Sequence, residues 1–149
     1  MNIIIEGCDG VGKTTLAKKL ADKYCCDILH MTKNSDKTLD SYISKMLNKN
    51  IIFDRCFISE YVYSKVFNRT TNIDEYALNF LLNFAYNQNY KIFILSISTD
   101  EIIKRLNIRG DEENDIIKNV SFLNDEYINC AKKFNIPIIS GGENIDSII

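Results

Sequence analysis

Five short apolar runs, separated by longer segments with helical periodicity, organise the chain of 149 residues. The runs lie at Met1–Ile5, Ile28–Met31, Asn50–Phe53, Lys91–Ile97 and Ile136–Ile139. Near-continuous apolar runs of this length are typical of strands that are buried on both faces, and strands that alternate with helices need crossover connections. The pattern therefore predicts an α/β protein in which helices cover both faces of a parallel sheet.

The segments between these runs carry helix signals of their own. Asn72 with Glu75 predicts an N-terminal cap, and Ser98 with Glu101 predicts a capping box for a helix through Leu106. One apolar stripe at helical spacing comprises Ala77, Phe80, Leu81 and Phe84. A second comprises Ile116, Val120, Leu123, Tyr127, Ala131 and Phe134. We expect the aromatic residues of both stripes to pack in the core.

The turn after the first apolar run carries the most specific signal. Residues Gly7–Thr14 read Gly-Cys-Asp-Gly-Val-Gly-Lys-Thr, which is the full phosphate-loop pattern between a strand and a helix. The glycines let backbone N–H groups approach an anion, and the helix adds its positive amino end. Lys13 supplies a charge for the β- and γ-phosphates, and the Thr14 hydroxyl is placed for Mg²⁺. The loop predicts ATP or another triphosphate as ligand.

Composition and charge narrow the class of protein. Charged residues make up 26% and hydrophobic residues 46% of the chain, which most simply forms one domain over residues 1–149. The net charge is −2 without a basic block, so binding to nucleic acid is not supported. No signal peptide is visible, and no apolar stretch approaches the ~20 residues of a membrane span. We expect a cytoplasmic protein without a nucleic-acid or membrane partner.

The cysteines agree with a reducing compartment. There are five, an odd number, without a Cys-x-x-Cys pair, and His30 is the only histidine. Free thiols fit this pattern better than disulfides or a zinc site. Cys8 lies inside the phosphate loop, where we interpret it as a small filler side chain. The alternative is an oxidisable residue that blocks ATP when it is modified.

A second group of polar residues follows the third apolar run, which reads Ile-Ile-Phe and ends in Asp54 and Arg55. In open parallel sheets, ligands bind at the carboxyl ends of the strands, so both residues should face the same crevice as Lys13. Asp54 could hold Mg²⁺ through water or take a proton from an acceptor, and Arg55 could clamp an acceptor phosphate through two N–H groups. The alternative is a helix-capping Asp and a surface Arg. A helix is expected next, over Cys56–Phe67.

Charge also gathers between Lys104 and Asp115, where Gly110 breaks the helical periodicity. Arg105 and Arg109 are four residues apart and therefore share one face of a helix. Cations on a closing lid can neutralise charge on a transferring phosphoryl group while water is excluded. We expect a lid at about residues 105–115. The alternative is a solvated face with local ion pairs.

Three motifs, in this order, resemble those of thymidylate kinases. Ile5–Thr15 resembles their phosphate loop, Phe53–Tyr63 their Asp-Arg-aromatic segment, and Arg105–Gly110 with the acidic cluster after it their lid. The short phage-type thymidylate kinase-like proteins look most similar, because Ile28–His30 and the cysteine after Asp-Arg are similar there. The resemblance implies a P-loop kinase fold with a five-stranded parallel sheet. It also implies phosphoryl transfer from ATP to a deoxynucleoside monophosphate with Mg²⁺.

The resemblance further implies roles for individual residues, and it allows a homodimer. Asp9 would contact the acceptor sugar or its phosphate, Arg55 would grip the acceptor phosphate, and the turn that contains Gly141 would hold adenine. The candidate catalytic residues are Lys13, Asp54, Arg55, Arg105 and Arg109, and the candidate metal ligands are Thr14 and Asp54. The candidate nucleotide-binding residues are Gly7, Asp9, Gly10, Val11, Gly12, Lys13, Thr14, Thr15 and Gly141.

Departures from the family pattern keep other functions open. The usual base-reading arginine is absent from the segment around Phe80 to Tyr86, so the base is not fixed. Deoxynucleoside kinases, which phosphorylate a 5′-hydroxyl, also carry an acidic-Arg pair and an Arg-rich lid, but they usually place a carboxylate base where this chain has His30. A non-catalytic nucleotide-binding regulator is a third alternative, although the Asn-Lys-x-Asp motif of GTPases does not occur in the sequence.

Overall fold

The computed structural model contains one parallel sheet with the strand order β2-β3-β1-β4-β5. The structure describes residues 1–110 and 115–140. Each strand overlaps one of the predicted apolar runs, with ends shifted by two residues at most, so the five-stranded parallel sheet is confirmed. The strands are β1 (Asn2–Glu6), β2 (Asp27–His30), β3 (Ile51–Asp54), β4 (Tyr90–Ser96) and β5 (Ile138–Ser140).

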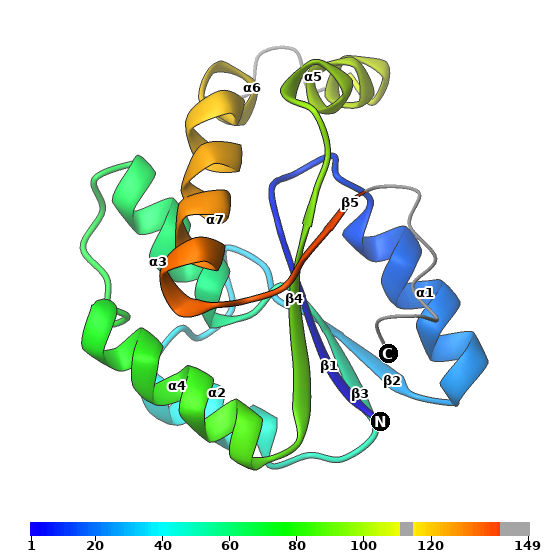
Figure 1. Ribbon diagram of the computed structural model, residues 1–149, viewed down its shortest axis with the longest axis vertical. Coiled ribbons are helices and arrows are strands. Elements are labelled where there is room, and N and C mark those ends of the chain that lie inside the picture. The colour runs from blue at the N-terminus through cyan, green and yellow to red at the C-terminus, as the bar shows by residue number, and fades with distance from the viewer. Residues whose placement is uncertain (111–114, 141–149) are drawn as a thin grey trace.

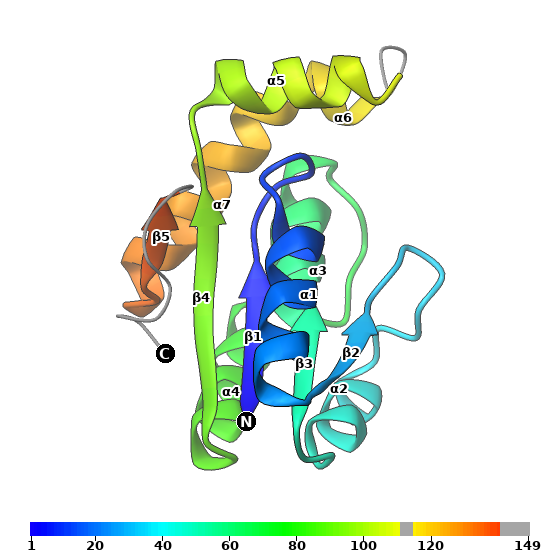
Figure 2. The same ribbon diagram turned by 90° about the vertical axis from the view of Figure 1, so that its right-hand side faces the viewer.

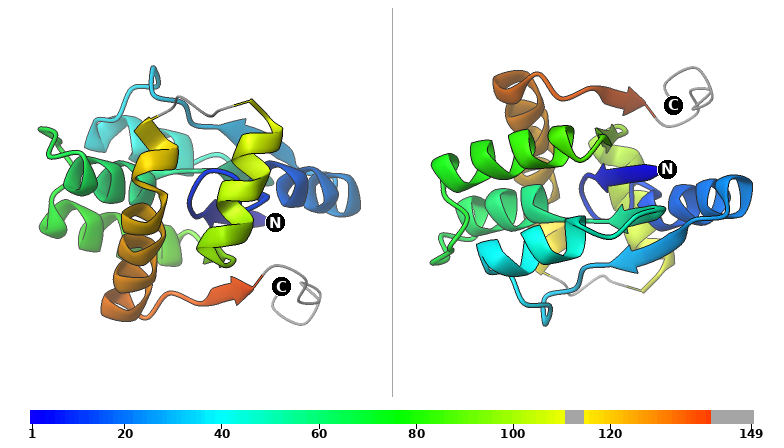
Figure 3. Two further views of the ribbon diagram at one scale, coloured as in Figure 1. Left: turned by 90° about the horizontal axis from the view of Figure 1, so that it is seen from above. Right: turned by 90° about the horizontal axis from the view of Figure 1, so that it is seen from below.

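Helices lie on both faces of the sheet, as the alternation of strands and helices predicts. One face is covered by α1 (Lys13–Tyr24) (Figure 1). The other is covered by α2 (Leu39–Met46), α3 (Phe57–Val66), α4 (Glu75–Asn87) and α7 (Val120–Phe134), and the views along the vertical axis show the same two layers (Figure 3). The two remaining helices, α5 (Thr99–Ile108) and the short α6 (Asp115–Lys118), lie beyond the carboxyl ends of the strands (Figure 2).

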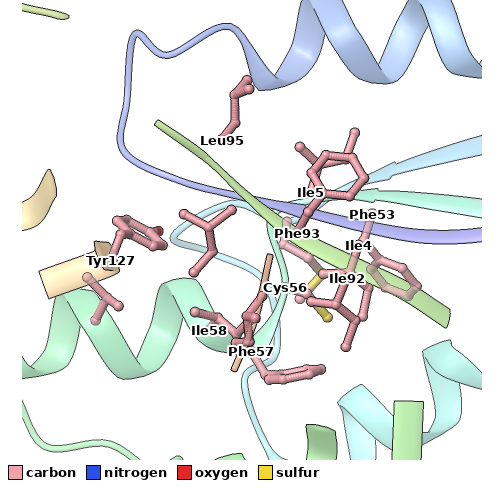
Figure 4. Packing of buried hydrophobic residues seen from close by; sticks show 14 of the residues in the cluster. Ile4, Ile5, Phe53, Cys56, Phe57, Ile58, Ile92, Phe93, Leu95 and Tyr127 are labelled. Carbon is pink, nitrogen blue, oxygen red and sulfur yellow. The ribbon is translucent and has the colours of Figure 1, made fainter. Parts of the chain in front are cut away.

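The central strands are apolar at consecutive positions because both of their faces are covered. Ile3, Ile4 and Ile5 of β1 are fully buried, and so are Ile52 and Phe53 of the neighbouring strand β3. Figure 4 shows these two strands and β4 contributing side chains to one continuous core. A two-sided core of this kind fixes the strand register, because a shift by one residue would bring a polar residue into the sheet.

The start of α4 differs from the prediction. Its N-cap is Asp74, whose side chain accepts a hydrogen bond from the N–H of Ala77 at 2.9 Å, and not Asn72. The buried stripe of α4 is displaced by one residue from the predicted stripe. Phe80, which was predicted to be in the core, is 51% exposed and stacks on Phe84. The segment offers two overlapping apolar stripes, and packing selects the aliphatic one. The buried face consists of Leu78, Leu81, Leu82 and Ala85.

The later helices follow the prediction more closely. Ser98 caps α5 and accepts from the N–H of Glu101, whose carboxylate binds Arg105 within the same helix. The long final stripe is divided at Asn119, so that Ile116 belongs to α6 and the remainder to α7. In the described part of the chain, no helix is long and apolar enough to cross a bilayer.

Candidate nucleotide and acceptor site

The ends of β1 and β3 bring two distant sequence segments together. These strands are neighbours in the sheet, with Ile5 in register with Asp54. Beyond the paired residues, the N–H of Arg55 donates to the carbonyl oxygen of Ile5 at 3.0 Å. The phosphate loop after β1 and the Asp54-Arg55 pair therefore leave the sheet side by side. Lys13, Asp54 and Arg55 line one cavity as a result.

The phosphate loop adopts a conformation that requires glycine. Gly7 has φ +140°, and a Cβ atom there would lie 2.3 Å from the carbonyl oxygen of Leu95 in β4. Gly12 is the N-cap of α1 with φ 102°, and it has no side chain to satisfy the N–H groups of the first turn. The N–H groups at such a helix start are available to bind an anion.

Lys13 is a buried cation held against the loop. Its side chain is 5% exposed, and Nζ donates to the carbonyl oxygen of Cys8 at 2.6 Å. Burial, together with the nearby charge of Arg55, lowers the pKa of Lys13 to about 8, while Asp9 and Asp54 act in the opposite direction. An anionic ligand would favour the charged ammonium, so the residue is suited to bind phosphate.

Asp54 presents a buried carboxylate at the end of β3. Its Oδ2 accepts from the Thr14 hydroxyl at 2.5 Å and lies 2.9 Å from His30 Nδ1. Its Oδ1 is buried and, among the described residues, has no hydrogen-bond partner. A carboxylate oxygen without a partner beside a hydroxyl fits Mg²⁺, which prefers oxygen ligands. No group of three or more His, Cys, Asp or Glu side chains in residues 1–110 and 115–140 is arranged to hold a metal, so substrate phosphate and water would complete the shell.

Arg55 lines the same cavity as Lys13 and has an unusual backbone conformation. Its φ of +72° is in the left-handed region, which costs energy for a residue with a Cβ. The guanidinium forms an ion pair with Asp9, donates to the Tyr63 hydroxyl at 3.3 Å and lies 5.3 Å from the centre of that ring. Burial alone would raise the pKa of Asp9, but the charges of Arg55 and Lys13 hold it below its ordinary value.

Glu6, which is not among the predicted site residues, organises this region. Its fully buried carboxylate accepts from the N–H groups of Cys56, Ile58 and Ser59 at 2.8–3.2 Å, and from the Ser59 hydroxyl. Tyr127 Oη in turn lies 2.8 Å from the Ser59 oxygen. Glu6 thereby caps α3 from the end of β1, and burial raises the pKa of its carboxyl group. An acidic residue at the end of an apolar strand is the only sequence signal for this role.

The helix α5 lies over the phosphate loop (Figure 2). Arg105 Nη1 is 3.4 Å from the carbonyl oxygens of both Gly10 and Val11, while Nε donates to Glu101 at 2.8 Å. Arg109 follows as the C-cap of α5 and lines the same cavity as Arg105. Both arginines thus border the phosphate loop from above.

The helix α5 ends at Ile108, two residues beyond the predicted end at Leu106. Residues 111–114 of the expected lid, and Gly141 with the expected adenine turn, lie outside the described residues. Gly7 and Val11 are buried within the phosphate loop rather than exposed to its cavity.

Two adjoining cavities occupy the carboxyl ends of the strands, and they share Asp9, His30 and Arg55. The phosphate-loop cavity has a volume of about 600 Å³, and the second cavity about 620 Å³. The phosphate-loop cavity is also lined by Gly10, Gly12, Lys13, Thr14, Thr15, Asp54, Arg105, Ile108 and Arg109. The second is also lined by Met31, Thr32, Lys33, Lys37, Tyr42, Cys56, Ser59, Glu60, Tyr63, Phe67, Arg69 and Ile116.

The relatives found by sequence comparison include probable thymidylate kinases. The chain is 31% identical over 116 residues to the SPbeta prophage-derived protein YorR of Bacillus subtilis (strain 168), covering 74% of this chain and 70% of YorR. It is 29% identical to a probable thymidylate kinase of Methanococcus vannielii, covering 87% of this chain and 77% of the relative. A probable thymidylate kinase of Picrophilus torridus is 27% identical, with 93% and 86% covered. No protein-family profile matches the chain.

Solved structures agree on the fold. The crystal structure of Bacillus subtilis YorR, in complex with phosphorylated GDP, has a TM-score of 0.81 and 25% identity, covering 99% of this chain and 91% of YorR. Deoxyadenosine kinase from M. mycoides, solved with dCTP, has a TM-score of 0.62 at 22% identity, with 99% and 94% covered. These relatives, together with the phosphate loop and the parallel sheet, place the chain among the thymidylate kinase-like P-loop kinases, in a short form that it shares with YorR.

Proposed function

We propose that the protein transfers the γ-phosphoryl group of ATP to a deoxynucleoside monophosphate and releases ADP and the diphosphate. The observation that carries this proposal is the wall shared by the two cavities, formed by Asp9, His30 and Arg55. A triphosphate in the phosphate-loop cavity and an acceptor in the second cavity would meet at this wall. The binding of phosphorylated GDP by the related YorR and the probable thymidylate kinases among the relatives support a nucleotide as ligand.

Phosphoryl transfer depends on positioning and on neutralising charge. Lys13 and the N–H groups of the phosphate loop would hold the triphosphate, and Arg55 would align the phosphate of the acceptor. Arg105 and Arg109 would neutralise charge that spreads over the transferring group. Asp54 and the Thr14 hydroxyl would hold Mg²⁺, which supplies further neutralisation at the phosphate oxygens.

We assign residues 1–149 to one kinase domain, with residues 105–115 as a lid that excludes water from the phosphate-loop cavity. The ligands would be small nucleotides in the cytoplasm. All five cysteines are free thiols in the structure, which fits that compartment.

The second candidate function is a deoxynucleoside kinase, and the position of His30 favours it. This residue ends β2, lies 2.9 Å from Asp54 and lines both cavities. A proton acceptor at that point suits the 5′-hydroxyl of a nucleoside, which must lose its proton, whereas a monophosphate acceptor is already ionised.

A panel of deoxynucleosides and their 5′-monophosphates with labelled ATP and Mg²⁺ separates these functions. Transfer to monophosphates supports the proposal, and transfer to nucleosides alone replaces it with the second candidate. Tight ATP binding without transfer to any member of the panel would indicate the non-catalytic regulator. Lys13→Ala serves as the control that should abolish transfer in either kinase.

A further inference from the structure

The second cavity contains a buried carboxylate that the proposed phosphoryl transfer does not use. Glu60 lies on α3, and its side chain is 6% exposed. Its Oε2 is 2.9 Å from Lys37 Nζ and 3.5 Å from Arg69 Nη2. All three residues line the second cavity, but none lines the phosphate-loop cavity. We call these three residues the Glu60 cluster.

The Glu60 carboxylate has unused capacity to accept hydrogen bonds. Although two cations lie close to Oε2, this atom makes no hydrogen bond of good geometry to any residue in the described ranges. A buried charge is costly when its oxygens are not satisfied. Lys37 and Arg69 are 25% and 44% exposed, so both can also turn toward a ligand. The Glu60 cluster therefore offers one acceptor group flanked by cationic donors.

The rest of the second cavity indicates which part of an acceptor meets this cluster. Arg55 and Asp9 belong to the wall shared with the phosphate-loop cavity, so the sugar and phosphate should lie there. Apolar and aromatic side chains then line the space that a planar base would occupy. They are Met31, Tyr42, Phe67 and Ile116. The edge of the base is left to face the Glu60 cluster.

We infer that the second cavity selects guanine, with Glu60 accepting from the N1–H and N2–H groups of the base and Lys37 or Arg69 donating to O6. Guanine presents two adjacent donors that match the two oxygens of a carboxylate, next to a carbonyl that matches a cation. Thymine presents one N–H between two carbonyl oxygens, and these would face the Glu60 carboxylate unfavourably. Adenine and cytosine offer one amino group beside a ring nitrogen acceptor. This inference rests on the proposed function, since it places the acceptor in the second cavity.

The test compares dGMP, dAMP, dCMP and dTMP as acceptors for wild type, Glu60→Gln and Glu75→Gln. Glu75 is half-exposed on α4 and pairs with Lys133, so it is a matched carboxylate outside both cavities. We expect kcat/KM to favour dGMP over dTMP by about tenfold or more in wild type and in Glu75→Gln. The ratio of kcat/KM for dGMP to that for dTMP should fall about tenfold or more in Glu60→Gln, mainly because KM for dGMP rises. A glutamine amide matches the N3–H and carbonyl of thymine better than the two N–H groups of guanine.

Calorimetric binding of dGMP and dTMP to the same three proteins separates this inference from the proposed function. The guanine assignment is overturned if dTMP is used as well as dGMP, or if Glu60→Gln leaves the ratio of their kcat/KM values unchanged. Either result leaves the kinase proposal intact. Glu60-dependent binding of dGMP without transfer to any acceptor supports the assignment and removes the proposed kinase activity. Absence of both binding and transfer overturns both. If thermal unfolding shows that Glu60→Gln does not fold, Lys37→Met replaces it, with loss of dGMP preference as the expected result.

Discussion

Arg55 and Asp9 are bound to each other at the wall that the two cavities share. The Tyr63 hydroxyl donates to the second oxygen of the Asp9 carboxylate at 2.5 Å, so the pair is held in place. An acceptor phosphate would replace Asp9 as the anion bound to Arg55. In that exchange the carboxylate of Asp9 becomes available to accept from a sugar hydroxyl. The ion pair thus holds both groups in a defined position.

Arg55→Ala tests this relationship. We expect KM for the acceptor to rise tenfold or more, because a bidentate charged contact is lost, while the affinity for ATP changes by less than about twofold. Steady-state kinetics with the acceptor varied, together with calorimetry of ATP binding, measure the two effects. Lys65→Ala is the control, since Lys65 lies on the following helix α3 but pairs with Glu126 away from both cavities. Unchanged acceptor kinetics in Arg55→Ala would show that the acceptor lies elsewhere.

The lowered pKa of Lys13 predicts a pH dependence of nucleotide binding. The pKa is about 8 in the free protein, so the ammonium is mostly charged at pH 7 and mostly neutral at pH 9. Bound phosphate favours the charged form, and affinity should therefore fall by about tenfold between these values. Calorimetry of ATP at saturating Mg²⁺ measures this change. Lys13→Met should bind more weakly at both values and lose the dependence, and a similar pH dependence in that variant would assign the effect to another group.

Asp54→Asn tests the proposed metal ligand. The amide keeps the size of the side chain and can still accept from Thr14, but it lacks the negative charge that Mg²⁺ requires. We expect the gain in ATP affinity on adding Mg²⁺ to fall about tenfold or more, with metal-free ATP binding little changed or slightly stronger. Titrations with and without Mg²⁺ provide the comparison. An unchanged Mg²⁺ effect would mean that the ion does not use this carboxylate.

Glu6→Ala tests the cap on α3. The substitution leaves the N–H groups of Cys56, Ile58 and Ser59 without their acceptor, and it should lower the free energy of unfolding by about 2–4 kcal/mol. Urea unfolding followed by circular dichroism gives this quantity. Glu75→Ala, at a half-exposed carboxylate, should change it by less than about 1 kcal/mol. Equal stability of the two variants would contradict the capping role.

Arg105→Ala tests the arginine that lies over the phosphate loop. We expect kcat to fall about tenfold to a thousandfold with little change in KM for the acceptor, because the charge acts on the transferring group. The neighbouring Lys104, which does not line either cavity, supplies the control Lys104→Ala. A kcat equal to that of the control would limit Arg105 to a structural contact with Gly10 and Val11.

The fold follows from the sequence because its central strands are buried on both faces. Such strands give apolar runs that stand out from the helices, and Ile3–Ile5 is the clearest case. The helix α4 shows where periodicity fails. Leu78 to Ala85 and Ala77 to Phe84 both have helical spacing, and only packing against the sheet and neighbouring helices decides between them. The cap at Asp74 is displaced for a similar reason, since several residues near it are suitable caps.

The candidate site follows from the sequence only where its residues form local motifs. Lys13 and Thr14 belong to the phosphate loop, and Arg55 follows directly from a buried strand. Glu6 bonds N–H groups about fifty residues away, and Glu60 meets cations from two different loops. Such contacts depend on the strand order and on the packing of α3, which no local pattern specifies.

The shared wall of Asp9, His30 and Arg55 also has a pharmacological consequence. A bisubstrate compound, in which a polyphosphate chain tethers adenosine to a second nucleoside, would fill both hollows at once. Tethering converts the second binding event into an intramolecular one and raises the effective concentration of the second nucleoside to the millimolar range or above. Inhibitors of this type should exceed the affinity of either half alone by about a hundredfold or more. Their best linker length would report how far apart the two substrates sit.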